Sequence, residues 1–246
     1  MTLLCLIGPS CSGKTTLAEA LVPTGIDTIR SYTTRPMRPG EKQGREHIFI
    51  DEQDAIRLLT TRRPLAYTLF GGYRYFALWE QVGLSPMSAD SALPSISRGS
   101  TEDTAPTPTP DTHRLITYVI DEAGYHSLIT RSIELQYELR DRYRIDIEDI
   151  TLLPIRIERS EADITDTIDP ARRARDIDRP DPGTIPYRIT IHNDAPSVYQ
   201  LTQWAQTQLA PALRIWLNST PEHTDFAHLT TQMGIAQIIA HLNGAI

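Results

Sequence analysis

The sequence predicts an α/β fold in which a parallel sheet is flanked by helices. Residues 2–7, 115–120 and 151–157 are short, nearly continuous apolar runs, which are typical of strands buried on both faces. The first run is followed by a glycine-rich turn and then by a helical pattern at 16–21, the order of a βα unit. The chain has 246 residues, enough for one large domain or two small ones.

The composition is that of an ordinary globular protein, with 40% hydrophobic and 22% charged residues. The net charge of −7 argues against a nucleic-acid partner, because binding to phosphate backbones needs a basic surface. Cys5 and Cys11 are the only cysteines, so we expect no disulfide scaffold and a reducing compartment. No apolar run approaches the roughly 18 residues of a membrane span, and the N-terminus lacks the pattern of a signal peptide. We therefore expect a cytoplasmic protein.

The turn after the first predicted strand, GPSCSGKT at 8–15, fits the pattern G-x-x-x-x-G-K-[ST]. Glycines let successive backbone N–H groups point at one anion, and the following helix adds the positive end of its dipole. Lys14 would reach the β- and γ-phosphates of ATP, and the Thr15 hydroxyl would ligate Mg²⁺. A chance match in a turn is the alternative. The candidate nucleotide-binding residues are Gly8, Ser10, Ser12, Gly13, Lys14, Thr15 and Thr16.

A second phosphate-binding pattern follows at 30–50, RSYTTRPMRPGEKQGREHIFI. Arg35 and Arg38 stand three residues apart among prolines that stiffen the loop, and Gly40-Glu41 predicts a turn. Guanidinium groups bind phosphate oxygens in pairs, so this loop suits a dianionic phosphate. An ordinary charged surface loop is the alternative. Residues 47–50 predict the start of a strand.

The two patterns together resemble the guanylate kinase family. The resemblance implies a P-loop NTPase fold with an acceptor-binding (NMP-binding) subdomain at about 31–80 and a lid at about 158–180. It implies transfer of phosphate from ATP to a nucleoside or deoxynucleoside monophosphate, with GMP or dGMP as the family's usual acceptor. By this resemblance Ser31, Arg35 and Arg38 bind the acceptor phosphate and Glu41 orders the arginines. His47 stands where the family carries a phosphate-binding tyrosine, and a partly buried strand residue is the alternative.

The next segment, LAYTLFGGYRYFA at 65–77, departs from the family pattern. Phe70, Gly72 and Tyr75 match it, and the resemblance makes Tyr75 a substrate-binding candidate. Ala66 and Ala77 stand where the family places a guanine-reading glutamate and a small hydroxyl residue. Alanine offers no hydrogen bond to a base, so the acceptor base stays open. The side chains that could replace these groups are Thr68, Arg74 and Glu80.

The later predicted strands end in further candidates. Asp121 follows the run at 115–120, at the strand end that faces ligands in a parallel sheet, and it is a candidate for Mg²⁺ and the acceptor; a helix N-cap is the alternative. Arg159, Arg172 and Arg173 occupy the predicted lid and would neutralise the transferred phosphoryl group, although charges there also suit a solvated helix. Asn193 is a candidate for the nucleotide-base site, with a plain turn residue as the alternative.

The predicted domain organisation is a kinase-like domain at 1–213 and a C-terminal helical extension at 214–246. The domain is interrupted at 83–114 by a segment rich in Ser, Thr and Pro, which we expect to be disordered. A helix is expected at 196–213 and an amphipathic helix in the extension, which would pack or form a dimer surface. We expect small-molecule nucleotides as partners and a monomer or homodimer. The alternatives are a P-loop kinase with a non-standard acceptor and a non-catalytic nucleotide-binding scaffold.

Overall fold

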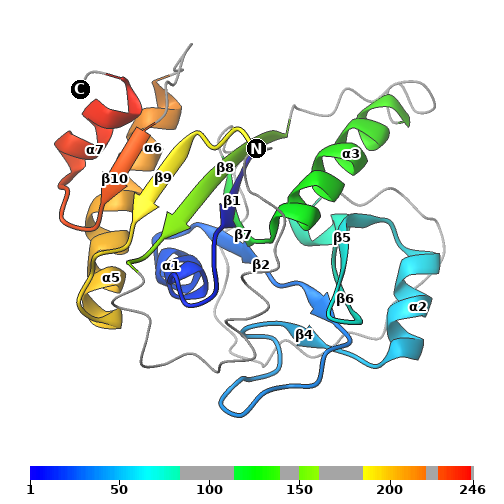
Figure 1. Ribbon diagram of the computed structural model, residues 1–246. Coiled ribbons are helices and arrows are strands. Elements are labelled where there is room, and N and C mark those ends of the chain that lie inside the picture. The colour runs from blue at the N-terminus through cyan, green and yellow to red at the C-terminus, as the bar shows by residue number, and fades with distance from the viewer. Residues whose placement is uncertain (84–113, 139–149, 161–184, 220–226, 245–246) are drawn as a thin grey trace, which may run out of the picture.

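The computed structural model describes residues 1–83, 114–138, 150–160, 185–219 and 227–244 (Figure 1). The predicted insertion at 83–114 lies almost wholly outside these described residues. The same holds for most of the predicted lid at 158–180, including Arg172 and Arg173.

A six-stranded sheet forms the centre of the molecule, in the order β10-β9-β8-β1-β7-β2, and every neighbouring pair is parallel. The three apolar runs of the sequence are the adjacent strands β8, β1 and β7. This confirms the predicted α/β class. The six strands are β1 (Thr2–Ile7), β2 (Asp27–Ile29), β7 (Leu115–Val119), β8 (Thr151–Glu158), β9 (Ile189–His192) and β10 (Ala227–Thr230).

Helices on both faces of the sheet bury β1 completely, which explains its unbroken apolar sequence. Leu4 and Leu6 point into one core with helices from both ends of the chain, whereas Leu3, Cys5 and Ile7 point into a second core. The helix at Glu122–Glu138 and a hairpin at 64–78 complete the second core. The helices on these faces are α1 (Lys14–Leu21), α3 (Glu122–Glu138), α5 (Val198–Trp204), α6 (Ala210–Asn218) and α7 (Ile235–Leu242), with short turns η1 (Val22–Thr24) and η2 (Trp79–Val82).

A second, four-stranded sheet spans residues 32–78, inside the range predicted for the acceptor-binding subdomain. Its β5–β6 hairpin turns at Gly71-Gly72, where φ angles of 58° and 80° match the two-glycine turns that hairpins favour. Helix α2 (Glu52–Thr61), which the sequence analysis did not predict, packs Ala55 against Phe76. The strands, in sheet order, are β4 (Ile48–Phe49), β3 (Tyr32–Thr33), β6 (Tyr73–Leu78) and β5 (Pro64–Phe70).

The predicted boundary at 213/214 is wrong, because it falls inside a continuous helix. Helix α5 passes through a π-helical stretch, η6 (Ala205–Leu209), into α6 without a break. Pro211 explains the wider turn, since proline provides no N–H and crowds the preceding turn of a regular α-helix.

The C-terminal extension is also not wholly helical as predicted. Strand β10 pairs with β9 and extends the central sheet, and α7 packs Ile238 and Leu242 into the first core. The apolar pattern of the tail therefore reflects packing within the chain. Among the described residues, each helix falls short of the length or apolar character that a membrane span needs.

Candidate functional site

The loop between β1 and α1 depends on close backbone approach. A Cβ atom on Gly8 would lie 2.2 Å from the carbonyl oxygen of Ile157 on β8. Gly13 has a φ of 99°, and a Cβ there would lie 2.5 Å from Asn193 Nδ2. The two glycines of the motif thus let the loop pass against β8 and Asn193, which other residues would prevent.

The start of α1 has the properties of a phosphate cradle. Gly13 precedes the helix and, as a glycine, offers no side chain to cap it, so the positive end of the helix dipole faces the loop. Lys14 Nζ contacts the carbonyl oxygen of Pro9 and lies 3.4 Å from Ser12 Oγ. Its ammonium group therefore lies beside the loop, and the Thr15 side chain is exposed in the first turn.

Asn193 braces this loop. Its Nδ2 donates a hydrogen bond of 2.9 Å to the carbonyl oxygen of Ser12, and the residue is only 4% exposed. Its backbone N–H bonds Glu158 O at 2.8 Å, which ties the turn after β9 to the end of β8. The amide nitrogen is thus committed to the loop backbone. Asn193 also lines a cavity beside the P-loop, and its contact with the nucleotide base stays a prediction.

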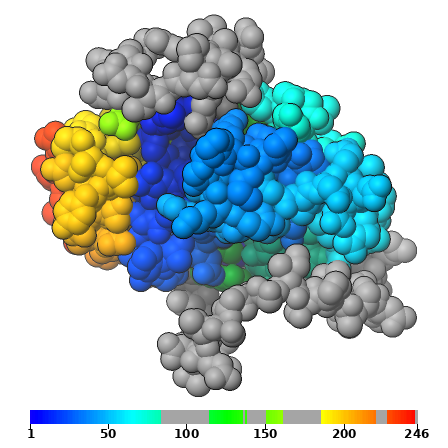
Figure 2. Space-filling model, turned by 90° about the horizontal axis from the view of Figure 1, so that it is seen from below, coloured from blue at the N-terminus to red at the C-terminus, as the bar shows by residue number. Residues whose placement is uncertain are grey.

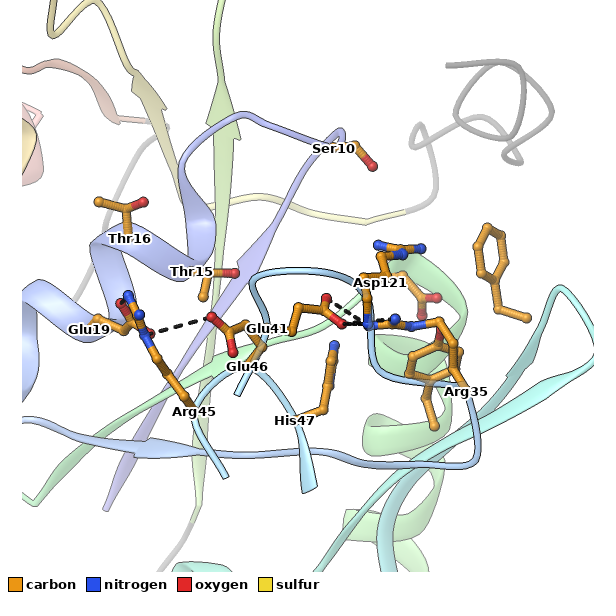
Figure 3. Close-up of a pocket in the computed structure, with 13 residues that line it drawn as sticks. Ser10, Thr15, Thr16, Glu19, Arg35, Glu41, Arg45, Glu46, His47 and Asp121 are labelled. Carbon is orange, nitrogen blue, oxygen red and sulfur yellow. Dashed lines mark hydrogen bonds and ion pairs between the residues drawn. The ribbon is translucent and has the colours of Figure 1, made fainter. Parts of the chain in front are cut away.

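The segment at 30–50, the predicted acceptor loop, is organised by one carboxylate. Arg35 donates to both oxygens of Glu41 at 2.9 Å each (Figure 3). The Arg38 backbone N–H donates to the same carboxylate at 2.8 Å. Arg35 is 7% exposed and Glu41 17% exposed. Burial opposes the ionisation of Glu41, but the hydrogen bonds from Arg35 and Arg38 outweigh it and lower its pKa.

The two predicted phosphate-binding regions, the P-loop at 8–15 and the acceptor loop, face one cavity of about 450 Å³. Figure 3 shows the P-loop side chains on one side of this cavity and the Arg35–Glu41 pair on the other. Figure 2 shows the α1 region, in dark blue, lying between the α5 region and the segment at 31–50. The structure thus brings residues from both regions together around one cavity. The lining residues include Ser10, Thr15, Thr16, Glu19, Arg35, Arg38, Glu41, His47, Tyr75 and Asp121.

Two further cavities adjoin this one. A cavity of about 330 Å³ lies on the P-loop side. Its lining includes Cys11, Lys14, Arg159 and Asn193, and Ala195, Ser197, Val198 and Leu201 around the start of α5. Arg159 Nε is buried and has no hydrogen-bond partner among the described residues. A smaller cavity of about 140 Å³ lies beside Ser31, Ala66 and Asp121. Arg172 and Arg173, the other predicted lid cations, lie outside the described residues.

Asp121 caps a helix, and its carboxylate also faces two of the cavities. Its Oδ1 accepts a hydrogen bond of 2.7 Å from the Gly124 N–H, which caps the start of α3. The Thr68 hydroxyl lies 3.4 Å from the same oxygen. The carboxylate also lines both the large and the small cavity, so it is fixed by the helix and presented to a ligand.

Comparison with known proteins finds that part of the chain is similar in sequence to curated guanylate kinases. Over 53 residues the chain is 47% identical to a guanylate kinase of Legionella pneumophila (strain Lens), a match that covers 21% of this chain and 25% of the relative. Over 72 residues it is 39% identical to a guanylate kinase of Thermobifida fusca (strain YX), covering 28% of this chain and 37% of the relative. Over these segments the chain is similar to guanylate kinases.

The relationship covers only part of each protein. The matches span about a quarter to over a third of the length of these curated guanylate kinases. No protein-family model matches the chain. A crystal structure of guanylate kinase from Anaplasma phagocytophilum aligns with a TM-score of 0.49 at 19% identity, covering 87% of this chain and 85% of that one.

Of the two alanines that depart from the predicted guanylate kinase pattern, Ala66 lines the small cavity. Ala66 and Ala77 are buried and face each other across β5 and β6. Of the proposed replacements, only Thr68 lines the cavity. Arg74 is held by Glu52 at 2.5 Å and Glu80 by Arg62 at 3.2 Å, so these two are engaged elsewhere.

Two features of the site escaped the sequence analysis. Tyr118 lines the small cavity, and its hydroxyl lies 3.5 Å from Ser31 Oγ. The signal for it was a tyrosine within the otherwise aliphatic and hydroxyl-bearing run LITYVI. The second feature is an ion pair that joins α1 to the acceptor loop, in which Arg45 bonds both oxygens of Glu19 at 2.9 and 3.1 Å. No local sequence signal pairs residues this far apart.

Proposed function

We propose that this protein transfers the γ-phosphoryl group of ATP to a nucleoside or deoxynucleoside monophosphate, with GMP and dGMP as the first acceptors to test. The observation that carries the proposal is the shared cavity, in which the P-loop faces the Arg35–Glu41–Arg38 cluster. Phosphoryl transfer needs two phosphates held in line by separate groups, and this cavity offers one set of groups for each. The named function of the curated relatives supports the same reaction.

The residues present fit ATP and Mg²⁺. The glycine loop and the start of α1 suit a polyphosphate, since Gly8 and Gly13 let the loop keep its shape where a Cβ would clash with Ile157 or Asn193. Thr15 and Asp121 line one cavity and provide the oxygen ligands that Mg²⁺ prefers. Among the described residues no group of three or more His, Cys, Asp or Glu could hold a metal ion, which suits a cation held largely by phosphate oxygens. ATP with Mg²⁺ would supply the transferable group and neutralise its charge.

The protein's own residues would act by position and charge. Lys14 would leave its contact with Pro9 and bind the transferred phosphate. Arg35 and Arg38 would hold the acceptor phosphate, and Glu41 would keep both arginines in place before the substrate arrives. Arg159, with its unpartnered Nε on the P-loop side, would neutralise charge that develops in the transition state, as would Arg172 and Arg173 of the lid.

A second acceptor class is favoured by a specific observation. Ala66 lines the small cavity where the family pattern places a glutamate. The polar side chains that line this cavity are Lys14, Ser31, His47, Tyr67, Thr68, Tyr75, Tyr118 and Asp121. A site without the guanine-reading glutamate has less reason to reject other bases. An acceptor other than a guanine nucleotide therefore remains the second candidate.

The test is ADP formation from ATP and Mg²⁺ with each ribo- and deoxynucleoside monophosphate in turn. We expect a response to at least one acceptor. Lys14→Ala should lower the turnover by about 10²-fold or more, because the positive charge of Lys14 would stabilise the negative charge on the transferred phosphoryl group in the transition state. Lys42→Ala is the matched control, since Lys42 is the only other lysine and lines none of the three cavities. ATP binding without turnover of any acceptor would favour the scaffold alternative instead.

A further inference from the structure

The turn that braces the P-loop is itself held by the C-terminal part of the chain. This turn, residues 193–195, follows β9, and Asp194 Oδ1 accepts a hydrogen bond of 2.9 Å from the Thr231 backbone N–H. The Thr231 hydroxyl donates to the same oxygen, and Gln232 Nε2 donates to Oδ2 at 2.9 Å. Three donors thus converge on one carboxylate, from residues that stand 37 and 38 positions further along the chain.

Two consecutive residues of this turn face two distant segments. Asn193 Nδ2 bonds the Ser12 carbonyl oxygen in the P-loop, while Asp194 bonds the residues that follow β10. The backbone N–H of Asn193 bonds Glu158 O at 2.8 Å, and that of Asp194 bonds His192 O at 3.1 Å. The two residues therefore belong to one tight turn, and a shift of Asp194 would move Asn193 and the bond that it makes to Ser12.

The contact at Asp194 is a charged one. The slight burial of Asp194 opposes its ionisation, but the hydrogen bonds from Thr231 and Gln232 outweigh this effect and lower its pKa. The carboxylate is therefore ionised at neutral pH. Hydrogen bonds to an ionised acceptor are stronger than those between neutral groups, so the contact can hold the turn although it lies at the surface.

The donors of this contact stand on a fixed base. Strand β10, which ends one residue before Thr231, pairs with β9 at the edge of the central sheet (Figure 1). Just beyond the donors, Trp204 Nε1 donates to the Met233 carbonyl oxygen at 2.9 Å. The backbone N–H of Ile235 donates to Gln208 Oε1 at 3.1 Å. The segment from β10 to α7 is thus attached on both sides of the two residues that bond Asp194.

We propose that Asp194, Thr231 and Gln232 are positioning residues of the ATP site. They would act through Asn193, which passes their constraint to the Ser12 carbonyl and so to the shape of the P-loop. None of the three is among the described residues that line the cavities, so they would act without touching the nucleotide. The inference rests on the proposed function, because it takes ATP as the ligand of the P-loop. It makes the C-terminal segment at 227–244 a part of the ATP site, outside the domain that the sequence predicts for it.

The experiment measures the P-loop with and without a nucleotide. Hydrogen–deuterium exchange of the peptide that spans 8–17 reports the mobility of the free loop, and calorimetric titration with ATP and Mg²⁺ reports its affinity. The variants are Asp194→Ala, which removes the acceptor, and Gln232→Ala, which removes one donor. Asp194→Asn keeps an oxygen for Thr231 and is the conservative substitution. Gln208→Ala is the matched control, because it removes an attachment of the same C-terminal segment without touching the turn.

We expect the P-loop peptide of Asp194→Ala to exchange faster than that of the wild type. Its ATP affinity should fall by about two- to thirtyfold, the range of couplings carried through an intermediate residue. Gln232→Ala should show the same two changes to a smaller extent, Asp194→Asn should stay nearer the wild type than Asp194→Ala, and Gln208→Ala should change neither quantity. A thermal melt checks that each variant is folded, and Gln232→Ala carries the test if Asp194→Ala does not fold.

Unchanged exchange and affinity in folded Asp194→Ala and Gln232→Ala would overturn the inference. Equal loosening of the P-loop by Gln208→Ala would overturn it as well, because the effect would then come from the C-terminal segment as a whole. The proposed function is tested separately by turnover of a monophosphate. A wild type that neither binds ATP nor turns over any acceptor would overturn the proposed function, and the exchange of the free P-loop would still decide whether these residues position it.

Discussion

The side chain of Asn193 holds the carbonyl oxygen of Ser12 at 2.9 Å, although the two residues stand 181 positions apart. This bond joins the turn after β9 to the P-loop between β1 and α1. Gly13 makes the approach possible, since a Cβ on it would meet the Asn193 amide. The shape of the phosphate cradle is therefore set by two distant strands of the central sheet as well as by the local motif.

Asn193→Ala should destabilise the fold and weaken ATP binding. The variant leaves the buried Ser12 carbonyl without its donor, which costs about 1–3 kcal/mol of the free energy of unfolding. ATP affinity should fall as well, because the loop loses a constraint on its bound shape. Urea denaturation measures the first effect and calorimetric titration with ATP and Mg²⁺ the second. Asn243→Ala, at an exposed asparagine after α7, serves as the control and should change neither quantity. Unchanged unfolding and binding in Asn193→Ala would contradict the bracing role.

The Arg35–Glu41 pair should make stability depend on pH in the acid range. The pKa of Glu41 is lower in the folded protein than its ordinary value, so its contribution to stability is present above the ordinary pKa and is lost as the pH falls through the folded pKa. Glu41→Gln should cost about 2 kcal/mol at pH 7, the order of a hydrogen-bonded charged group. The difference between wild type and variant should shrink below about pH 4, where the carboxylate of the unfolded chain is already protonated.

Urea denaturation of both proteins at several pH values between 3 and 7 measures this difference. Glu52→Gln is a suitable control, because the Glu52–Arg74 pair is more exposed, at 53% and 31%, and exposed pairs contribute little. A constant difference between wild type and Glu41→Gln down to pH 3 would show that the Glu41 carboxylate does not supply the stability.

The parts of the site that could be predicted from sequence are those coded by neighbouring residues. The P-loop and the Arg35–Glu41 turn are short motifs whose residues contact one another within the loop. The three long apolar strands were likewise predictable, since each is buried on both faces. In each case the physical cause lies within a few residues of its signal.

The parts that could not be predicted depend on contacts between distant segments. The edge strands β2 and β10 have only three and four residues, too few for a recognisable alternation. The Glu19–Arg45 pair and the Asn193–Ser12 bond exist only because the sheet order places α1 beside the acceptor loop and β9 beside β8. The boundary predicted at 213/214 failed for a related reason: the helix continues because Leu213 and Trp216 pack into the core.

The two cysteines should differ sharply in reactivity. Cys11 is half-buried in the P-loop and lines the 330 Å³ cavity, whereas Cys5 is 0% exposed in the middle of β1. Burial also raises the pKa of the Cys5 thiol, which disfavours the reactive thiolate. An alkylating reagent such as iodoacetamide should therefore modify one site in the native protein and both sites in urea, as intact-mass spectrometry would show.

ATP with Mg²⁺ should slow this alkylation, because a nucleotide in the P-loop cavity would cover Cys11. The comparison separates binding from turnover, since protection needs no acceptor and no chemistry. Cys11→Ser is the control and should take up no reagent in the native state, because Cys5 stays within the core that β1 shares with α3. Protection of Cys11 by GMP alone, without protection by ATP, would mean that the P-loop side of the site holds the acceptor and that the assignment of donor and acceptor sides is reversed. If Cys5 in the native protein were labelled as fast as Cys11, β1 would have to open to solvent. That result would contradict the burial of β1 on both faces of the sheet.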